Sequence, residues 1–293
     1  AIAPKGECNL VHEVSQQLPI FTLSEILGIP EYDRQKLVSW MEFLELAQYF
    51  THEMIKEQNE GKTDSTPDQA MIDMFNSMVD EMFEYGRFIL KEKRKNPAND
   101  LLSAIANAEI NGEKLSDEFL DGSWLLIIFA GNDTTRNTMS GGIKLLHENQ
   151  KQKEMLIDNL ELLPNFINET IRCVSPVIHM RRTSLEETEI NGQKIGPYEK
   201  IALWYGAANR DPDVFEDPDK FNILRDNADK HLAFGIGRHT CIGKPVALMQ
   251  LQEFYSQFLT RFQDFEMNGD WKVAPNNFVH AIQEMPIKFS PSK

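Results

Sequence analysis

The chain has 293 residues, of which 41% are hydrophobic and 26% are charged, a composition that is ordinary for a globular protein with a large buried core. Its formal net charge of −15 excludes nucleic acid as a general partner, because so acidic a surface repels a phosphate backbone. The three cysteines form no C-x-x-C pair, which excludes a disulfide framework and indicates a reducing, cytoplasmic location.

Helical spacing of apolar residues dominates the first two thirds of the chain. It predicts helices over residues 33–58, 69–95, 100–108, 117–148 and 164–172. Residues 59–68 form a polar break with glycine and proline, and Ser116 stands in the position of an N-cap. The most apolar run, residues 124–131, is too short to cross a bilayer, so we predict no membrane span.

After Pro176 the pattern changes to short runs typical of strands. They predict strands over residues 177–183, 188–196 and 200–206. The Asn191-Gly192 pair inside the second run predicts a hairpin turn. Helix is expected again after Cys241, followed by closing strands near the C-terminus. The predicted fold class is therefore mainly α with a small β region.

The segment of residues 231–243, HLAFGIGRHTCIG, carries the strongest chemical signal. Gly235 and Gly237 permit backbone angles closed to other residues, so the chain can turn tightly before Cys241. Cys241 is expected just before a helix N-terminus, where the helix dipole and free amides favour a thiolate. Gly243 would let that helix lie close to a flat group. Such a thiolate suits a haem iron, and a buried free cysteine beside a glycine turn is the alternative.

Six residues of this segment resemble the haem-binding loop of the cytochrome P-450 family, the haem-thiolate monooxygenases, whose motif is Phe-Gly-x-Gly-x-His-x-Cys-x-Gly. The matching residues are Phe234, Gly235, Gly237, His239, Cys241 and Gly243. The resemblance implies the cytochrome P-450 fold and haem b (iron protoporphyrin IX) as the cofactor. It implies that Cys241 is the metal ligand, that all six residues belong to the cofactor site, and that His239 serves a haem propionate.

A second motif, AGNDTT at residues 130–135, lies inside the long predicted helix. Gly131 there costs about 1 kcal/mol relative to alanine, and adjacent threonines weaken the helix further. Alone, the pattern describes either a helix bend with a solvated aspartate or an acid–alcohol pair lining an oxygen pocket. The family's distal helix carries the same motif. The resemblance implies that Asp133 and Thr134 relay protons to bound dioxygen, with Ala130 and Gly131 at the cofactor.

Two charged groups complete the resemblance. Glu169 and Arg172 lie three residues apart on one predicted helical face, a spacing that alone indicates a weak surface ion pair. The family has an internal Glu-x-x-Arg pair completed by an arginine before the haem loop, and Arg225 matches that position, which implies a structural cluster. Arg182 matches the cation that the family supplies to a haem propionate. A solvated strand edge is the alternative for the arginines of this strand.

Apolar residues beside these motifs are expected to line the substrate side, although such a stripe is more often plain core. They are Leu125, Ile128, Phe129, Ala130, Val177, Ile178, Met180, Phe278 and Val279. A lining that contains methionine suits a flexible aliphatic chain. Several segments are similar to bacterial branches that hydroxylate alkanes, fatty acids, terpenoids or sterol side chains, which implies a hydrophobic small-molecule substrate.

The leading hypothesis is a bacterial haem-dependent monooxygenase that inserts one atom of O2 into a C–H bond. Electrons are expected from a ferredoxin or flavodoxin with its NAD(P)H-dependent reductase, docked near Lys230, Arg238 and Lys244. A peroxide-driven enzyme is disfavoured, because an adjacent acid and alcohol at Asp133 and Thr134 suit the dioxygen route.

The resemblance runs from about Leu10 to the C-terminus, and the front of the family fold has no counterpart. Residues 1–293 are therefore expected to form a single haem-thiolate monooxygenase domain that is N-terminally truncated, without the first strands and helices. The alternative is a truncated remnant that binds no haem and has no activity. Stoichiometric haem in the purified chain discriminates between the two hypotheses.

Overall fold

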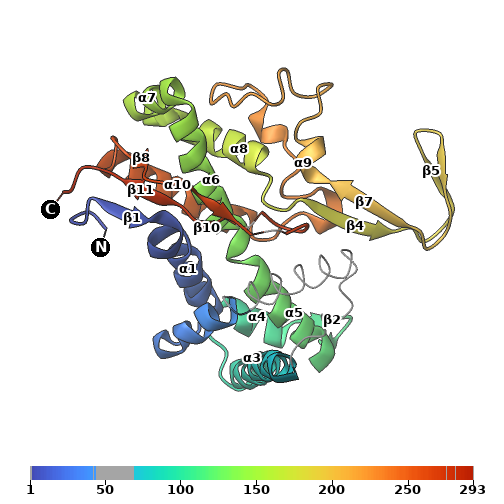
Figure 1. Ribbon diagram of the computed structural model, residues 1–293. Helices are drawn as coiled ribbons and strands as arrows, with labels where there is room; N and C mark the ends of the chain where they lie inside the picture. Colours follow the sequence, from blue (N-terminus) through green and yellow to red (C-terminus); the bar gives the residue numbers. More distant parts are fainter. Residues whose placement is uncertain (1, 42, 44–68, 275, 281, 293) are drawn as a thin grey trace. The chain divides into compact units, whose positions relative to one another are not determined.

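The computed structural model describes residues 2–41, 43, 69–274, 276–280 and 282–292 (Figure 1). The chain divides into two compact units. The first, which we call the helical unit, is Gln16–Asp133, and the second, which we call the cysteine unit, joins Ala1–Ser15 to Thr134–Lys293. Helices outnumber the short strands in the described residues, so the predicted class, mainly α with a small β region, is confirmed.

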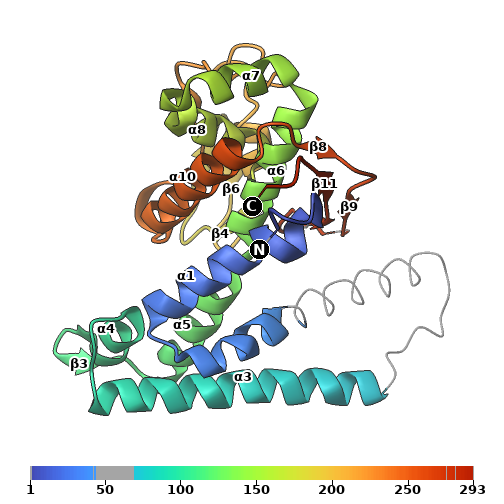
Figure 2. The ribbon, with the colours of Figure 1, turned by 90° about the vertical axis from the view of Figure 1, so that its left-hand side faces the viewer.

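The helical unit is built from amphipathic helices with defined caps. Its elements are α1 (Gln17–Leu27), the 3-10 turn η2 (Glu31–Asp33), a helical stretch over residues 34–41, α3 (Gln69–Lys95), α4 (Leu101–Asn107), the strand pair β2 (Glu109–Ile110) and β3 (Glu113–Lys114), and α5 (Asp117–Ala130). Asp100 caps α4 by accepting a 2.7 Å hydrogen bond from the amide of Ser103. Ser116 caps α5 in the same way, 3.2 Å from the amide of Phe119, as predicted. Figure 2 shows the length of α3.

Aromatic side chains form the centre of the helical unit. Trp40, Tyr85 and Trp124 pack with ring centroids between 5.4 and 6.2 Å apart. The indole nitrogen of Trp124 donates a 2.9 Å hydrogen bond to the carbonyl of Met82, which satisfies its polar atom in the interior. A Cβ atom at Gly86 would lie 2.5 Å from the Trp124 ring, so glycine permits the close contact of α3 with α5.

The cysteine unit has its own set of helices. They are the π-helix η1 (Val11–Ser15), α6 (Asp133–Glu148, whose first residue belongs to the helical unit), α7 (Gln150–Asp158), η3 (Leu160–Leu162), α8 (Leu163–Val174), α9 (Tyr205–Ala208), η4 (Ala228–Lys230), η5 (Gly237–His239) and α10 (Lys244–Arg261). Tyr255 of α10 donates a 2.6 Å hydrogen bond to the carbonyl of Thr138 on α6, and its ring packs 4.7 Å from Phe166 on α8. A side chain at Gly142 would overlap the Tyr255 hydroxyl.

Short antiparallel sheets complete the cysteine unit. Strand β11 (Pro286–Lys288) pairs with β1 (Glu7–Asn9) on one side and β8 (Glu266–Met267) on the other, so the two ends of the chain lie side by side (Figure 1). The other pairs are β9 (Lys272–Val273) with β10 (Ile282–Glu284), β4 (His179–Thr183) with β7 (Lys200–Trp204), and β5 (Thr188–Ile190) with β6 (Gln193–Ile195). Asn191 and Gly192, which join β5 to β6, both have positive φ, 49° and 80°, and this confirms the predicted hairpin.

The predicted helix over residues 117–148 is wrong in one respect, because the structure divides it at Gly131 and Asn132 into α5 and α6. The predicted helix over residues 69–95 is α3, with the same bounds. Residues 44–58 of another predicted helix, and the polar break after them, lie outside the described residues. Neither α7 nor α9 was predicted, because α7 is mostly polar and α9 has only 4 residues, so neither shows a clear helical period.

Candidate active site

The cysteine loop, which we define as residues 231–243, is closed by backbone hydrogen bonds. The amide of Cys241 donates a 2.8 Å hydrogen bond to the carbonyl of Phe234. Between them, Gly235 and Gly237 have φ of 69° and 72°, a left-handed conformation that side-chain-bearing residues rarely adopt. The tight turn predicted before the cysteine is therefore present.

The Cys241 thiol is exposed, and among the described residues its sulfur makes no hydrogen bond. Gly243 directly precedes α10. A Cβ atom at Gly243 would lie 3.7 Å from the Cys241 sulfur, which would be its nearest non-neighbouring atom. Ile236 and Ile242 are 73% and 91% exposed, so apolar surface flanks the thiol. An unpaired thiol with apolar neighbours and an open space beside it fits a flat, apolar group that binds through an iron–sulfur bond. The alternative of a buried cysteine is wrong.

Phe234 lies within the cysteine loop, near His231 and Lys244. Its ring is 5.7 Å from His231, and the Lys244 ammonium lies 5.4 Å from its centroid. Burial lowers the pKa of His231 to about 4, and the charge of Lys244 acts in the same direction. The His231 Nδ1 accepts a 3.3 Å hydrogen bond from the amide of Ala233, so a neutral imidazole supports the start of the loop. His239, at the end of η5, is exposed.

Gly131 ends α5 at the first part of the AGNDTT motif. Ala130 is the last residue of α5, and the Gly131 amide donates a 3.1 Å hydrogen bond to the carbonyl of Ile127. A Cβ atom at Gly131 would lie 2.9 Å from the Leu23 side chain of α1. Close packing therefore favours glycine here, although its φ of −78° is one that any residue adopts. The low helix propensity of glycine is consistent with the end of the helix at this point.

Asp133 and Thr134 are the next residues of the motif and begin α6. Asp133 is 9% exposed and accepts a 3.2 Å hydrogen bond from the Asn132 side chain. The solvated aspartate considered as one alternative is therefore excluded. The carbonyl of Thr134 accepts a 2.8 Å hydrogen bond from the Thr138 hydroxyl one turn later. Asp133 is the last residue of the helical unit, and Thr134 belongs to the cysteine unit together with Cys241.

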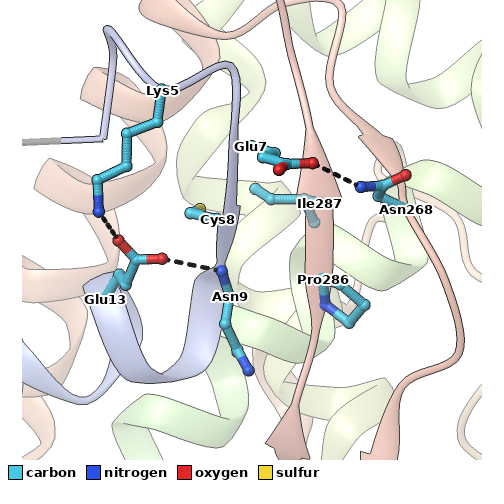
Figure 3. Close-up of a pocket in the computed structure, with 8 residues that line it drawn as sticks. All are labelled: Lys5, Glu7, Cys8, Asn9, Glu13, Asn268, Pro286 and Ile287. Atoms are coloured by element: carbon cyan, nitrogen blue, oxygen red, sulfur yellow. Dashed lines mark hydrogen bonds and ion pairs between the residues drawn. The ribbon is translucent and has the colours of Figure 1, made fainter.

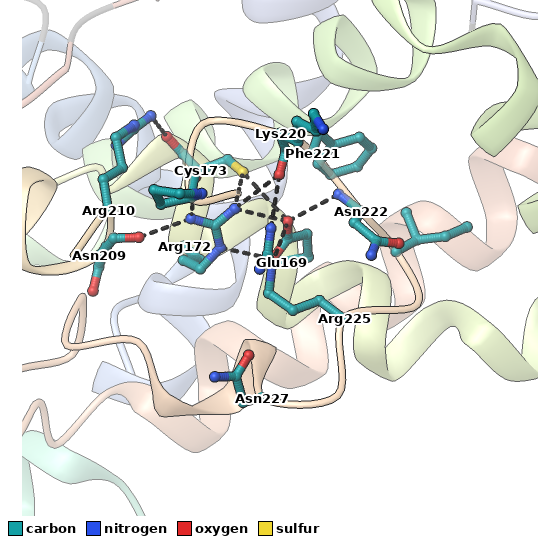
Figure 4. Close-up of polar contacts among 12 residues, drawn as sticks. Glu169, Arg172, Cys173, Asn209, Arg210, Lys220, Phe221, Asn222, Arg225 and Asn227 are labelled. Carbon is teal, nitrogen blue, oxygen red and sulfur yellow. Dashed lines mark hydrogen bonds and ion pairs between the residues drawn. The ribbon is translucent and has the colours of Figure 1, made fainter. Parts of the chain in front are cut away.

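The cluster of Glu169, Arg172 and Arg225 is present and buried, as the resemblance implies (Figure 4). Arg172 donates to the two carboxylate oxygens of Glu169 through Nε and Nη2, at 2.7 and 2.8 Å. Arg225 Nε donates to the same two oxygens at 3.1 and 3.2 Å, and the amide of Asn222 adds a 2.9 Å hydrogen bond. Glu169 and Arg172 have no exposed surface, so the surface pair that the spacing alone indicates is wrong.

The remaining guanidinium hydrogens of this cluster bind the backbone that leads to the cysteine loop. Arg172 Nη1 donates to the carbonyls of Asn209 and Pro218 at 2.8 and 2.7 Å, and Arg225 Nη1 donates to the carbonyl of Glu216 at 2.6 Å. Each buried charge thus has several partners, as a stable buried ion cluster requires. No pattern in the sequence singled out Asn209, because its partners are distant along the chain.

The other two cysteines differ from Cys241 in environment. All three are free thiols. Burial raises the pKa of Cys8 to about 12, with a smaller contribution from the charge of Glu13. Burial raises the pKa of Cys173 to about 12 as well, and the charge of Glu169 adds to this effect. Burial therefore keeps both thiols protonated near neutral pH, whereas the Cys241 thiol is exposed.

Arg182 lies on β4, opposite Ile201 of β7, and is partly exposed. Its Nη1 donates a 2.9 Å hydrogen bond to the carbonyl of Arg181, whose own side chain is exposed. The described contacts of Arg182 are therefore local, and its guanidinium retains hydrogen-bond donors for an anion. Arg182 and the cysteine loop belong to the same unit.

Two of the segments expected to line the substrate side lie next to each other. Val177 and Val279 form an antiparallel bridge, and the amide of Ile178 donates a 2.8 Å hydrogen bond to the carbonyl of Phe278. Ile128, from the helical unit, differs, because it is fully buried in that unit's core. Ile128 is thus a core residue, which is the more common role of an apolar stripe.

A recess of about 370 Å³ lies elsewhere on the cysteine unit, beside β1 and β11 (Figure 3). It is lined by Lys5, Glu7, Cys8, Asn9, Glu13, Asn268, Pro286 and Ile287. Lys5 forms an ion pair with Glu13, and Glu7 accepts a 3.1 Å hydrogen bond from Asn268. Each charged side chain in the recess already has a partner, and no predicted site residue lines it.

Among the described residues, no helix has the length and apolar character to cross a bilayer.

Comparison with known proteins agrees with this geometry. The family model for cytochrome P-450 matches residues 35–289. The steroid C26-monooxygenase of Mycolicibacterium smegmatis is 33% identical over 294 residues, which cover all of this chain and 69% of that protein. The linalool 8-monooxygenase of Pseudomonas putida is 34% identical over 290 residues, which cover 98% of this chain and 67% of that protein.

A solved structure also resembles this chain over nearly its whole length. Substrate-free CYP109E1 from Bacillus megaterium matches with a TM-score of 0.84 at 28% identity, over 99% of this chain and 73% of that one. The similarity therefore covers the cysteine loop, the buried ion cluster and the α5–α6 junction together. The chain belongs to the cytochrome P-450 family and is a cytochrome P-450 monooxygenase.

Proposed function

We propose that this monooxygenase binds haem b through Cys241 and hydroxylates a hydrophobic small molecule, and that both units serve one catalytic domain. The observation that supports this most strongly is the exposed, unpaired Cys241 thiol on a glycine turn. When bound, the haem supplies the redox-active iron at which dioxygen is activated. The family relationship supports the same assignment.

On the sulfur side, the chain's own residues hold and shape the ligand. The amide of Cys241 is tied to Phe234, which limits the directions that the thiolate can take. Gly235, Gly237 and Gly243 add no side chain that would keep a flat group away from the sulfur. Arg182 and His239 would donate hydrogen bonds to the propionate carboxylates.

On the oxygen side, we assign proton delivery to Asp133 and Thr134. A buried carboxyl group and a hydroxyl group in succession can pass protons inward while the surrounding helix excludes bulk water. Ala130 and Gly131 present little side-chain bulk at the same junction, which would leave room for the cofactor and dioxygen.

We assign a substrate with exposed aliphatic C–H bonds, such as a steroid side chain or a terpenoid. The names of two relatives, a steroid C26-monooxygenase and a linalool 8-monooxygenase, support this class. The bridge between Val177 and Val279 supplies apolar side chains from two segments of the cysteine unit, which suits an apolar ligand.

Electrons would come from a ferredoxin or flavodoxin and its NAD(P)H-dependent reductase. Lys230 and Arg238 are exposed on or next to the cysteine loop, and Lys244 follows it. Because the whole chain is strongly acidic, a local group of cations beside Cys241 would direct an acidic electron carrier to this surface.

The test is to purify the chain and measure its haem content and the absorbance of its reduced carbon monoxide complex. We expect one haem per chain and the band characteristic of thiolate ligation. Titration with a steroid and with a linear terpenoid should then perturb the haem spectrum, and product should form with a ferredoxin and reductase. Absence of haem, or a band without the thiolate signature, would overturn the assignment of Cys241. Turnover with peroxide but not with the reductase would overturn the dioxygen route.

A further inference from the structure

One asparagine connects the buried ion cluster to the cysteine loop. Asn209 follows α9 and has no exposed surface. Its carbonyl accepts the 2.8 Å hydrogen bond from Arg172 Nη1, as Figure 4 shows. Its side-chain oxygen accepts a 2.6 Å hydrogen bond from the amide of Leu232, at the start of the cysteine loop. The same residue thus binds both features.

The orientation of the Asn209 amide is determined by a second partner. Its Nδ2 donates a 2.8 Å hydrogen bond to the hydroxyl of Ser175, which in turn donates to the carbonyl of Arg172 at 2.8 Å. Ser175 ends α8 with φ of 45°, a left-handed conformation that is unfavourable for a residue with a side chain. Ser175 is also buried, so these hydrogen bonds help to maintain its unfavourable conformation. Because the Asn209 Nδ2 is bound to Ser175, the Asn209 side-chain oxygen points toward the Leu232 amide.

Hydrogen bonds and the short stretches of backbone between them connect Asn209 to the amide of Cys241. Leu232, held by Asn209 through its amide, accepts a 2.8 Å hydrogen bond from Gly235 through its carbonyl. Phe234, within that turn, accepts the hydrogen bond from the Cys241 amide. A shift of Leu232 would therefore move the turn from which the cysteine projects.

We infer that Asn209 is a positioning residue, which holds the cysteine loop in the conformation that presents Cys241 to the iron. This inference rests on the proposed role of Cys241 as haem ligand. Asn209 acts through Leu232 and does not touch the reacting atoms. Its loss leaves the partly buried amide of Leu232 without this acceptor, which favours local opening of the loop.

The test compares Asn209→Leu with Asn165→Leu in the haem-loaded 293-residue chain. Asn165 is a matched control, because its side chain also ties α8 to distant backbone, the carbonyls of Ile223 and Arg225 at 2.8 and 3.1 Å. We measure amide hydrogen exchange of the peptide that contains Leu232, and the share of the reduced carbon monoxide complex in the thiolate band.

For Asn209→Leu we expect exchange at Leu232 to rise roughly tenfold to a hundredfold, because this partly buried amide loses its acceptor, together with a reduced thiolate share. Asn165→Leu should leave both readouts unchanged even where it lowers the unfolding temperature. Unchanged exchange and an unchanged band in Asn209→Leu would overturn the inference. If the wild-type chain shows no thiolate band, the role of Cys241 fails, whereas the exchange readout still tests the link to Leu232.

Two further variants keep the test decisive if Asn209→Leu does not fold. Asn209→Asp retains an oxygen acceptor for Leu232, so exchange should stay near the wild-type rate; a rise as large as that expected for leucine would overturn the inference. Ser175→Gly removes the hydroxyl and accommodates the positive φ. It should raise exchange at Leu232 by a smaller factor, because the Asn209 amide loses one of its partners. No rise would show that Ser175 does not orient Asn209.

Discussion

The amide of Cys241 lies 2.8 Å from the carbonyl of Phe234, and this hydrogen bond closes the turn made by Gly235 and Gly237. The sulfur itself has no hydrogen bond among the described residues. Its position therefore depends on the backbone on both sides. The backbone thus holds in place the thiol that we propose as the haem ligand, and such preorganisation lowers the cost of forming a metal bond.

Replacing Cys241 with serine should abolish the thiolate band of the reduced carbon monoxide complex and reduce hydroxylation to background, because a serine hydroxyl is a far poorer iron ligand than a thiolate. Cys8→Ser is the control, since Cys8 is a buried thiol on β1. It should keep the band. Retention of the thiolate band in Cys241→Ser would show that another residue binds the iron.

Replacing Glu169 with glutamine should lower the free energy of unfolding by about 3–5 kcal/mol, because it leaves two buried guanidinium groups without their carboxylate. Urea unfolding measures this change. The control is Glu284→Gln, which breaks the exposed Lys272–Glu284 ion pair and should have little effect. Equal losses in the two variants would mean that burial of the cluster does not matter for stability.

Replacing Thr134 with alanine should reduce the product formed per dioxygen consumed, because the hydroxyl that we assign to proton delivery is lost. Oxygen consumption and product are measured in the same reaction, with Thr135→Ala as the control. The haem spectrum of both variants should stay like the wild type. A coupling ratio in Thr134→Ala equal to that of the wild type would contradict the assignment.

Replacing Gly142 with alanine should destabilise the cysteine unit by about 1–3 kcal/mol, the usual cost of overpacking, because the new methyl group overlaps the Tyr255 hydroxyl. Adding Tyr255→Phe should recover part of this loss. Thermal unfolding measures both effects. Gly122→Ala on α5, where a Cβ atom meets nothing within 4 Å, should instead stabilise by roughly 1 kcal/mol. Destabilisation without recovery by Tyr255→Phe would indicate a different clash.

Stability should fall as the pH is lowered from about 6.5 to about 4, the pKa of His231 in the fold. His231 takes up a proton near pH 6.5 in the unfolded state but only near pH 4 in the folded state. Between these pH values the unfolded state binds more protons, so the free energy of unfolding decreases as the pH is lowered from 6.5 to 4. A shift of this size corresponds to roughly 3 kcal/mol. In His231→Gln the dependence should weaken in this range, as measured by urea unfolding at several pH values.

His280, whose pKa burial also lowers, contributes to the same window in both proteins. The difference between wild type and His231→Gln therefore isolates His231. Four charged groups act on the pKa of His231: Lys244 and Arg172 lower it, and Asp229 and Glu169 raise it. Identical slopes in the two proteins would show that His231 takes up its proton in the folded state at the same pH as in the unfolded state.

Local features could be predicted from the sequence because their causes lie within a few residues. The cap at Ser116, the bounds of α3 and the Asn191-Gly192 turn each depend on short-range backbone preferences. The cysteine loop belongs to this group as well, since its glycines and its cysteine are close together in the chain. The role of the cluster around Glu169 came from resemblance, because spacing alone indicated a surface pair.

Only the tertiary structure decided what depends on residues far apart in the chain. Leu23 packs against Gly131, and the long predicted helix ends there as two helices. The Asn209 side chain forms hydrogen bonds with Ser175 at the end of α8 and with Leu232 in the cysteine loop, and no local sequence pattern reveals them. Periodicity records which face of a helix is apolar, whereas the choice of partner depends on shape and on hydrogen bonds that only the folded chain brings together.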